Sequence, residues 1–169
     1  MKRTFSILHI SDLHKDKNAD YQYLLSSLET DCTKWASEGI PAPEFIVASG
    51  ALVQGVKDYR CTQNEADDEL LRQYGETEKF LKDLADIFLG GHRERVIIVP
   101  GNHDVNRNAS FRSMDELGVD KNIEIAKSLS NSGWVSEIYR WSWETCSFSQ
   151  IVRSDVYNER FDAFKRFYS

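Results

Sequence analysis

The chain of 169 residues has the length of one domain, and its 41% apolar and 12% aromatic content suffices for a hydrophobic core, which excludes a disordered protein. A net charge of −6, from 21 Lys and Arg against 27 Asp and Glu, excludes nucleic-acid binding through bulk positive charge. The cysteines are three in number and widely spaced, and neither a signal segment nor an apolar run of about 18 residues occurs, so we expect reduced thiols in a soluble cytoplasmic protein that does not contact membranes.

Three short apolar runs alternate with longer segments of helical periodicity. The runs are Phe5 to Ile10, Phe45 to Ala48 and Arg95 to Val99. The segments between them repeat apolar residues at helical spacing over 21–35 and 65–89, which predicts two amphipathic helices. Because strands that are separated by long helices need crossover connections, the first 105 residues predict an α/β fold with a parallel sheet covered on both faces.

The pattern is weaker after Val105. Apolar spacing predicts a helix over 119–129, the segment 134–143 is ambiguous, and Tyr157, Phe161, Phe164 and Tyr168 form an aromatic stripe at helical spacing. We interpret the stripe as core, or as a face that another element covers. No repeat or linker interrupts the chain, so we expect one domain over residues 1–169.

Polar residues follow each predicted strand at its carboxyl end, where open parallel sheets bind ligands. Asp12 and His14 follow the first strand, Ser49-Gly50-Ala51 the second, and Gly101-Asn102-His103-Asp104 the third. On extended backbone the carboxylate and the imidazole of the first pair point to the same side and could bind one ion together. Oxygen donors mixed with imidazole suit Mn²⁺, Fe or Zn²⁺ in a hydrolytic site better than a structural zinc.

In these motifs the sequence resembles the calcineurin-like metallophosphoesterases, whose marks are DxH, GD and GNHD or GNHE after successive strands. The resemblance covers roughly residues 5 to 110. It implies the N-terminal half of a two-sheet sandwich, with a mostly parallel sheet flanked by helices. It also implies two divalent metal ions, Mn²⁺ first and Fe, Zn²⁺, Ni²⁺ or Mg²⁺ as alternatives, with Asp12 and His14 holding one and Asn102 the other. His103 would then stabilise the pentacoordinate phosphorus or protonate the leaving oxygen, and Asp104 would orient His103 or its loop.

The chain departs from this pattern at Ala51, which stands where the family has the bridging Asp. Alanine has no donor atom, so two cations would lie together without the anion that offsets their repulsion. A single metal could still bind weakly through Asp12 and His14. The neighbouring residues keep the family's character, which favours a single Asp→Ala change, engineered rather than natural. We therefore expect the chain to be catalytically inactive as it stands.

A second departure is that no histidine follows His103. The resemblance implies a lone His and a GHxH motif further along the chain, on strands that complete the sandwich. Either the chain is a fragment, or its missing ligands come from another polypeptide, or the second metal site does not exist. We expect the N-terminal part of a larger unit, completed by further residues of the protein or by a partner chain.

The substrate class follows only loosely from the sequence. The resemblance implies a phosphoester, and the long helix over 65–89 favours a phosphodiester, such as a nucleotide or nucleic acid, over a phosphoprotein. Arg107 and Arg112 offer the paired donors that match a phosphate, although surface solvation is their ordinary role. The competing hypothesis is a non-catalytic sensor or partner-binding subunit with a degenerate phosphoesterase fold.

Overall fold

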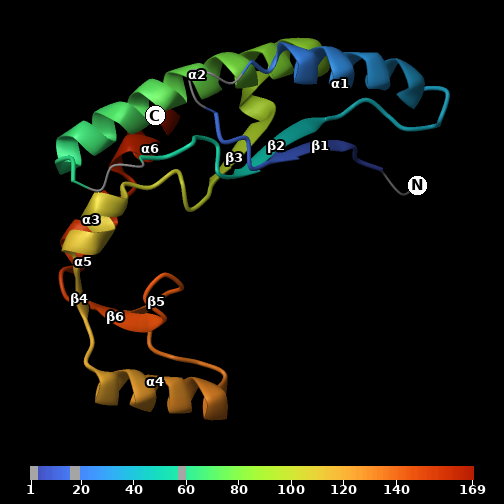
Figure 1. The fold of residues 1–169 in the computed structure, drawn as a ribbon. Coiled ribbons are helices and arrows are strands. Elements are labelled where there is room, and N and C mark those ends of the chain that lie inside the picture. Colours follow the sequence, from blue (N-terminus) through green and yellow to red (C-terminus); the bar gives the residue numbers. More distant parts are fainter. Residues whose placement is uncertain (1–3, 16–19, 57–59) are drawn as a thin grey trace.

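A computed structural model describes residues 4–15, 20–56 and 60–169 (Figure 1). In chain order the elements are β1 (Ile7–Ser11), α1 (Gln22–Trp35), β2 (Phe45–Gly50), α2 (Gln63–Leu89), the 3₁₀-helix η1 (Arg93–Arg95), β3 (Val96–Pro100), α3 (Arg107–Arg112), β4 (Met114–Glu116), α4 (Val119–Ser132), β5 (Tyr139–Ser142), β6 (Ser147–Ile151), α5 (Ser154–Glu159) and α6 (Asp162–Tyr168). The α/β class and the three strands of the first 105 residues are as the sequence predicts.

The first three strands form a parallel sheet in the order β1-β2-β3. Ser11 at the end of β1 pairs with Ser49, and Gly50 at the end of β2 pairs with Pro100 at the end of β3. The three carboxyl ends therefore lie level with one another, so the segments that follow them leave the sheet at the same edge.

The helices α1 and α2 lie side by side over one face of this sheet, with α6 next to α2 (Figure 1). The long helix α2 begins at a capping box, in which the Thr62 hydroxyl accepts from the Glu65 backbone and the Glu65 carboxylate accepts from the Thr62 backbone. It ends at Gly90 in the left-handed conformation. The core lies between this helical layer and the sheet and includes Ile46, Ala48, Leu70 and Leu84.

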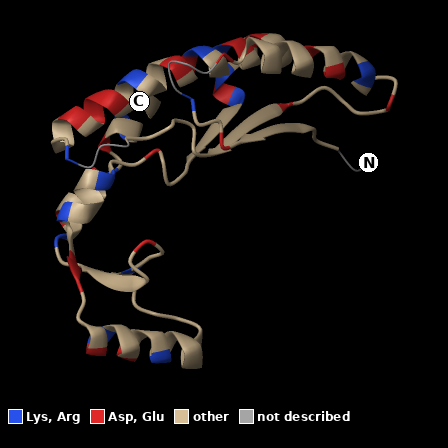
Figure 2. Ribbon diagram, in the orientation of Figure 1, with Lys and Arg blue, Asp and Glu red and all other residues tan. Residues whose placement is uncertain are grey.

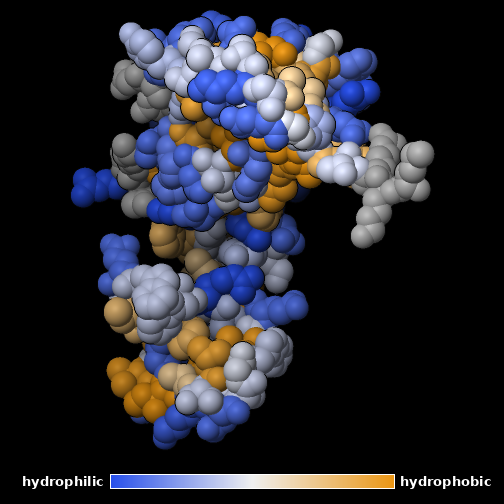
Figure 3. Space-filling model, turned by 90° about the vertical axis from the view of Figure 1, so that its right-hand side faces the viewer, coloured by the Kyte–Doolittle hydropathy of each residue, from blue (hydrophilic) through white to orange (hydrophobic). Residues whose placement is uncertain are grey.

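The opposite face of the sheet is open among the described residues, so the prediction of a sheet covered on both faces is wrong for this part of the chain. The apolar residues on that face remain exposed, with Ile7 at 55%, Ile97 at 46% and Val99 at 47% exposure. Figure 2 shows that charged residues concentrate on the helices and spare the three strands. Figure 3 shows apolar side chains reaching the surface below the helical layer. The open face has the composition of a surface that packs against another layer.

The second half of the chain adds a small antiparallel unit. Its sheet has the order β4-β6-β5, and α4 contacts β6. This unit lies apart from the parallel sheet and is reached through α3 and α5, which pack on each other (Figure 1). The helix predicted over 119–129 is confirmed as α4, and part of the ambiguous segment 134–143 forms β5.

The predicted aromatic stripe does not lie on one helix, because the segment breaks between α5 and α6. Tyr157 on α5 packs against the guanidinium groups of Arg140 and Arg160. Phe164, on α6, packs against the core beside Tyr74. Phe164 is therefore the residue of the stripe that contacts the core, whereas Tyr168 at its end is 61% exposed. No helix in the described ranges has the length and apolar content that a membrane span requires.

Candidate functional site

The segment after β1 runs alongside the segment after β2 and extends their pairing beyond the sheet. The backbone N–H of Asp12 donates to the Ser49 carbonyl at 3.1 Å, and the N–H of His14 donates to the Ala51 carbonyl at 2.9 Å. Between them Leu13 is buried, and its carbonyl accepts from the Tyr21 hydroxyl. These contacts fix Asp12 and His14 beside residues 49 to 51.

The backbone of this pair is not extended, contrary to the geometry that the sequence suggested. Asp12 has φ 52° and His14 has φ 47°, so both lie in the left-handed region that side chains rarely adopt. The two side chains still come from one turn, since a single residue separates them. The turn, rather than the alternation of a strand, sets their directions.

The carboxylate of Asp12 lies against Gly50. A Cβ at position 50 would lie 2.9 Å from Asp12 Oδ1, and Gly50 itself has φ 78°, so both the contact and the backbone require glycine there. The carboxylate therefore lies at the residue that precedes position 51. Ala51 is 1% exposed and contributes only a methyl group.

The loop after β3 packs directly on the loop after β2. A Cβ on Gly101 would lie 2.4 Å from the carbonyl carbon of Gly50, which shows how closely the two backbones approach. Asp104 is fully buried and joins the loops through its carboxylate, which accepts from the backbone N–H of Gly101 at 2.7 Å and from Leu52 and Val53 at 3.0–3.2 Å. Of the two roles considered for Asp104, this geometry gives it the positioning of the loop.

The hydroxyl of Tyr74 on α2 donates to the Asp104 carbonyl at 2.9 Å. Burial, together with the adjacent Asp104 carboxylate, raises the pKa of Tyr74 well above its ordinary value, so the phenol remains a donor. Burial also raises the pKa of Asp104, and the hydrogen bonds from the Gly101, Leu52 and Val53 backbone oppose that rise. Hydrogen bonds from three backbone N–H groups thus stabilise the buried carboxylate.

His103 lies against His14. The two ring centroids are 4.7 Å apart and the rings meet edge to face at 83°. His103 is half-buried, and its Nδ1 is 2.7 Å from the Gln54 carbonyl. The structure therefore brings together the residues that the sequence singled out after the first and third strands.

The remaining candidates are more peripheral. Asn102 is exposed at the tip of the third loop, next to His103. Arg107 and Arg112 are the first and last residues of α3, which packs on α5 rather than over the strand ends. Arg107 is half-buried and Arg112 is exposed. Arg107 is also the nearer of the two to the third loop along the chain.

Two residues of the site's support were not identified from the sequence. Gln73 is 3% exposed and hydrogen-bonds the backbone of Gly55, while Thr77 is fully buried and its hydroxyl lies 3.4 Å from the Leu52 carbonyl. Both are polar residues, four apart, within the apolar stripe of α2. Polar side chains inside a buried stripe are the signal that could have revealed them, because buried polar groups need partners.

Comparison with known proteins identifies the family. The family model for calcineurin-like phosphoesterases matches residues 5–162. The chain therefore belongs to the calcineurin-like phosphoesterases, which are metal-dependent phosphoester hydrolases and generally bind two divalent metals. No curated protein and no solved structure matched the chain.

The residues present do not fit a pair of bridged metal ions. In the part of the chain that the structure describes, no three His, Cys, Asp or Glu side chains lie close enough to hold a cation together. Asp12 and His14 offer one carboxylate and one imidazole, and Ala51 supplies no oxygen between them and the third loop. The chain thus keeps the donors before and after position 51 and lacks the carboxylate that the family shares between its two metals.

Proposed function

We propose that this chain carries the scaffold of a metal-dependent phosphoester hydrolase whose reaction is disabled by Ala51. The observation that supports it is the meeting of three loops, with Asp12 against Gly50, His14 beside His103, and the third loop fastened by Asp104. This arrangement keeps the surroundings of position 51 in place although the side chain there has no donor.

In this proposal each remaining residue has a stated task. Asp12 and His14, with Asn102, are the donors left for a divalent cation, for which Mn²⁺ is the first candidate. His103 moves a proton to or from the phosphoester oxygen, since its Nδ1 is held by the Gln54 carbonyl and Nε2 remains for exchange. Arg107 is the arginine that we place nearer the phosphate, with Arg112 further out.

We also propose a phosphodiester, such as a nucleotide or a nucleic acid, as the substrate. A partner layer over the open sheet face, supplied by further residues of the protein or by another chain, would complete the site. The exposed apolar residues on the open sheet face, Ile7, Ile97 and Val99, support this part of the proposal.

The test is the Ala51→Asp variant, assayed together with the layer that completes the site, with Ala51→Asn as the matched control that has the same size but no charge. Position 51 is buried and follows the glycine against which the Asp12 carboxylate lies, so a second carboxylate there should lower the melting temperature in metal-free buffer. Mn²⁺ should restore the melting temperature of Ala51→Asp and leave that of Ala51→Asn and of the present chain nearly unchanged. With Mn²⁺, Ala51→Asp should cleave bis-p-nitrophenyl phosphate, whereas Ala51→Asn and the present chain should not.

The competing function, a non-catalytic sensor or partner-binding subunit, rests on the missing donor at position 51. If Ala51→Asp is folded yet binds no Mn²⁺ by calorimetry and cleaves neither a phosphodiester nor a phosphomonoester, the hydrolase proposal fails. Binding of Mn²⁺ without cleavage would support the metal site but favour the sensor.

A further inference from the structure

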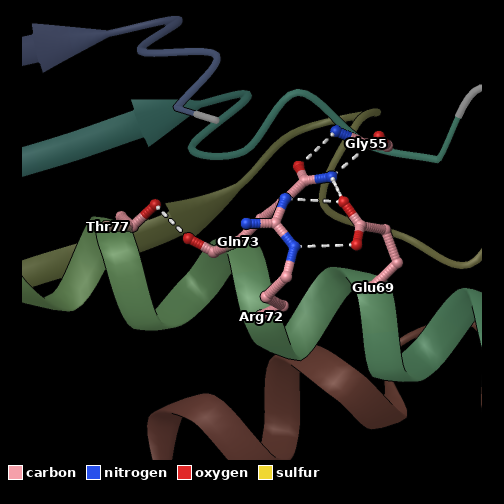
Figure 4. A network of polar contacts seen from close by, with 5 residues as sticks. All are labelled: Gly55, Glu69, Arg72, Gln73 and Thr77. Carbon is pink, nitrogen blue, oxygen red and sulfur yellow. Dashed lines mark hydrogen bonds and ion pairs between the residues drawn. The ribbon is translucent and has the colours of Figure 1, made fainter. Parts of the chain in front are cut away.

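Gln73, on α2, is hydrogen-bonded to both backbone groups of Gly55 (Figure 4). The Gly55 N–H donates to Gln73 Oε1 at 3.0 Å, and Gln73 Nε2 donates to the Gly55 carbonyl at 3.1 Å. A neighbouring strand would make the same pair of bonds with a residue of a sheet. One buried side chain thus fixes the position of the loop after β2.

The orientation of the Gln73 amide is itself fixed. Nε2 also donates to Glu69 Oε1 at 2.8 Å, and Glu69 is held in turn by two hydrogen bonds from Arg72, at 2.7 and 2.8 Å. Because Nε2 faces two acceptors, Oε1 must be the atom that faces the Gly55 N–H. Figure 4 shows this chain of contacts running from Arg72 to Gly55.

The loop peptide that Gln73 holds is the one that holds His103. The Gly55 N–H and the Gln54 carbonyl belong to the same planar peptide unit, so they point in opposite directions from one rigid group. Gln73 accepts from the N–H side, and His103 Nδ1 contacts the carbonyl side at 2.7 Å. Gly55 also packs on His103, since a Cβ at position 55 would lie 3.3 Å from Nδ1.

The contact determines which ring nitrogen carries the hydrogen. A carbonyl oxygen only accepts, so Nδ1 must be the donor and Nε2 of the neutral ring keeps its lone pair. Free imidazole favours the opposite tautomer, with the hydrogen on Nε2. The peptide between residues 54 and 55 therefore has to be held in place for His103 to present a basic Nε2.

We propose that Gln73 is a positioning residue for His103, which acts through the 54–55 peptide to fix the Nδ1–H tautomer. The catalytic consequence rests on the proposed function, whereas the tautomer itself does not. The two can therefore be tested separately, on the same chain.

The first experiment reads the ¹⁵N chemical shifts of the His103 ring at about pH 8, where free imidazole is neutral. In the present chain the Nδ1–H form should predominate. Gln73→Ala should reduce its population at least about twofold. Gln63→Ala, a substitution on the same helix that loses a side-chain bond to Glu159 on α5, should not change it.

Two results would overturn the proposal. One is an Nε2–H tautomer of His103 in the unmodified chain, a measurement that needs no variant to fold. The other is a folded Gln73→Ala chain with the unchanged Nδ1–H population.

The second experiment measures kinetics in the Ala51→Asp background. Gln73→Ala should lower kcat about tenfold or more with KM within about twofold, because general acid–base catalysis contributes about 10²–10⁴-fold. An equal loss on Gln63→Ala would mean a general effect of stability and would count against positioning. If Ala51→Asp is inactive even with the layer that completes the site, the proposed function fails while the tautomer result still decides the role of Gln73.

Discussion

Replacing Asp104 by alanine should destabilise the fold strongly, because its carboxylate joins two loops at a buried point. The substitution removes the acceptor of three backbone N–H groups, those of Gly101, Leu52 and Val53. A buried donor left without a partner costs about 1–3 kcal/mol, so three of them set a range of about 3–9 kcal/mol. Partial opening of the loop to water reduces the loss, and we expect about 4 kcal/mol.

The assay is urea unfolding followed by circular dichroism, which gives the free energy of unfolding by linear extrapolation. Asp104→Asn keeps one acceptor oxygen and should lose about 2 kcal/mol. Asp115→Ala, at an exposed position of β4, should change the free energy of unfolding by no more than about 0.5 kcal/mol. If Asp104→Ala lost as little as Asp115→Ala, the carboxylate would not be fastening the loops and the argument for its role would be wrong.

Two further predictions concern backbone contact and pH. Gly101→Ala would place its Cβ 2.4 Å from the Gly50 carbonyl carbon and 2.5 Å from the Ala51 nitrogen, so it should cost about 3 kcal/mol in thermal unfolding, and a loss below about 1 kcal/mol would contradict the close packing. Hydrogen bonds from Thr62 lower the pKa of Glu65. The stability that Glu65 contributes is therefore complete above its ordinary pKa and is lost as the pH falls through the folded value. Urea midpoints between about pH 6 and pH 3 should fall less steeply for Glu65→Gln than for the parent, and parallel profiles would exclude the capping contribution.

The arrangement of the first 105 residues could be predicted because each strand and helix has a clear periodicity and a clear end. The covering of the sheet could not. Ile7, Ile97 and Val99 are as apolar as their neighbours that face the helices, so the strands read as buried on both faces. Hydropathy shows that a face is suited to burial, but not whether the residues that bury it are within the described part of the chain.

The candidate site was predictable where its residues are close in sequence to a strand end. The left-handed turn at Asp12 and His14 was not, because neither residue type requires positive φ. The supports on α2 were missed for another reason. Gln73 and Tyr74 act on loops about 20 to 30 residues away, and no local pattern links a helix position to a loop peptide that it meets only after folding.

The left-handed conformation of Asp12 and His14 lowers the stability of the fold, while the side chains in this turn supply the donors of the candidate site. Outside glycine this conformation costs about 1–2 kcal/mol per residue, and aspartate tolerates it better than histidine. A screen for heat resistance alone would therefore reward glycine at either position, and would discard a carboxylate or an imidazole in the process. Thermally improved descendants of this protein should consequently be checked first for whether the Asp-x-His pair has survived.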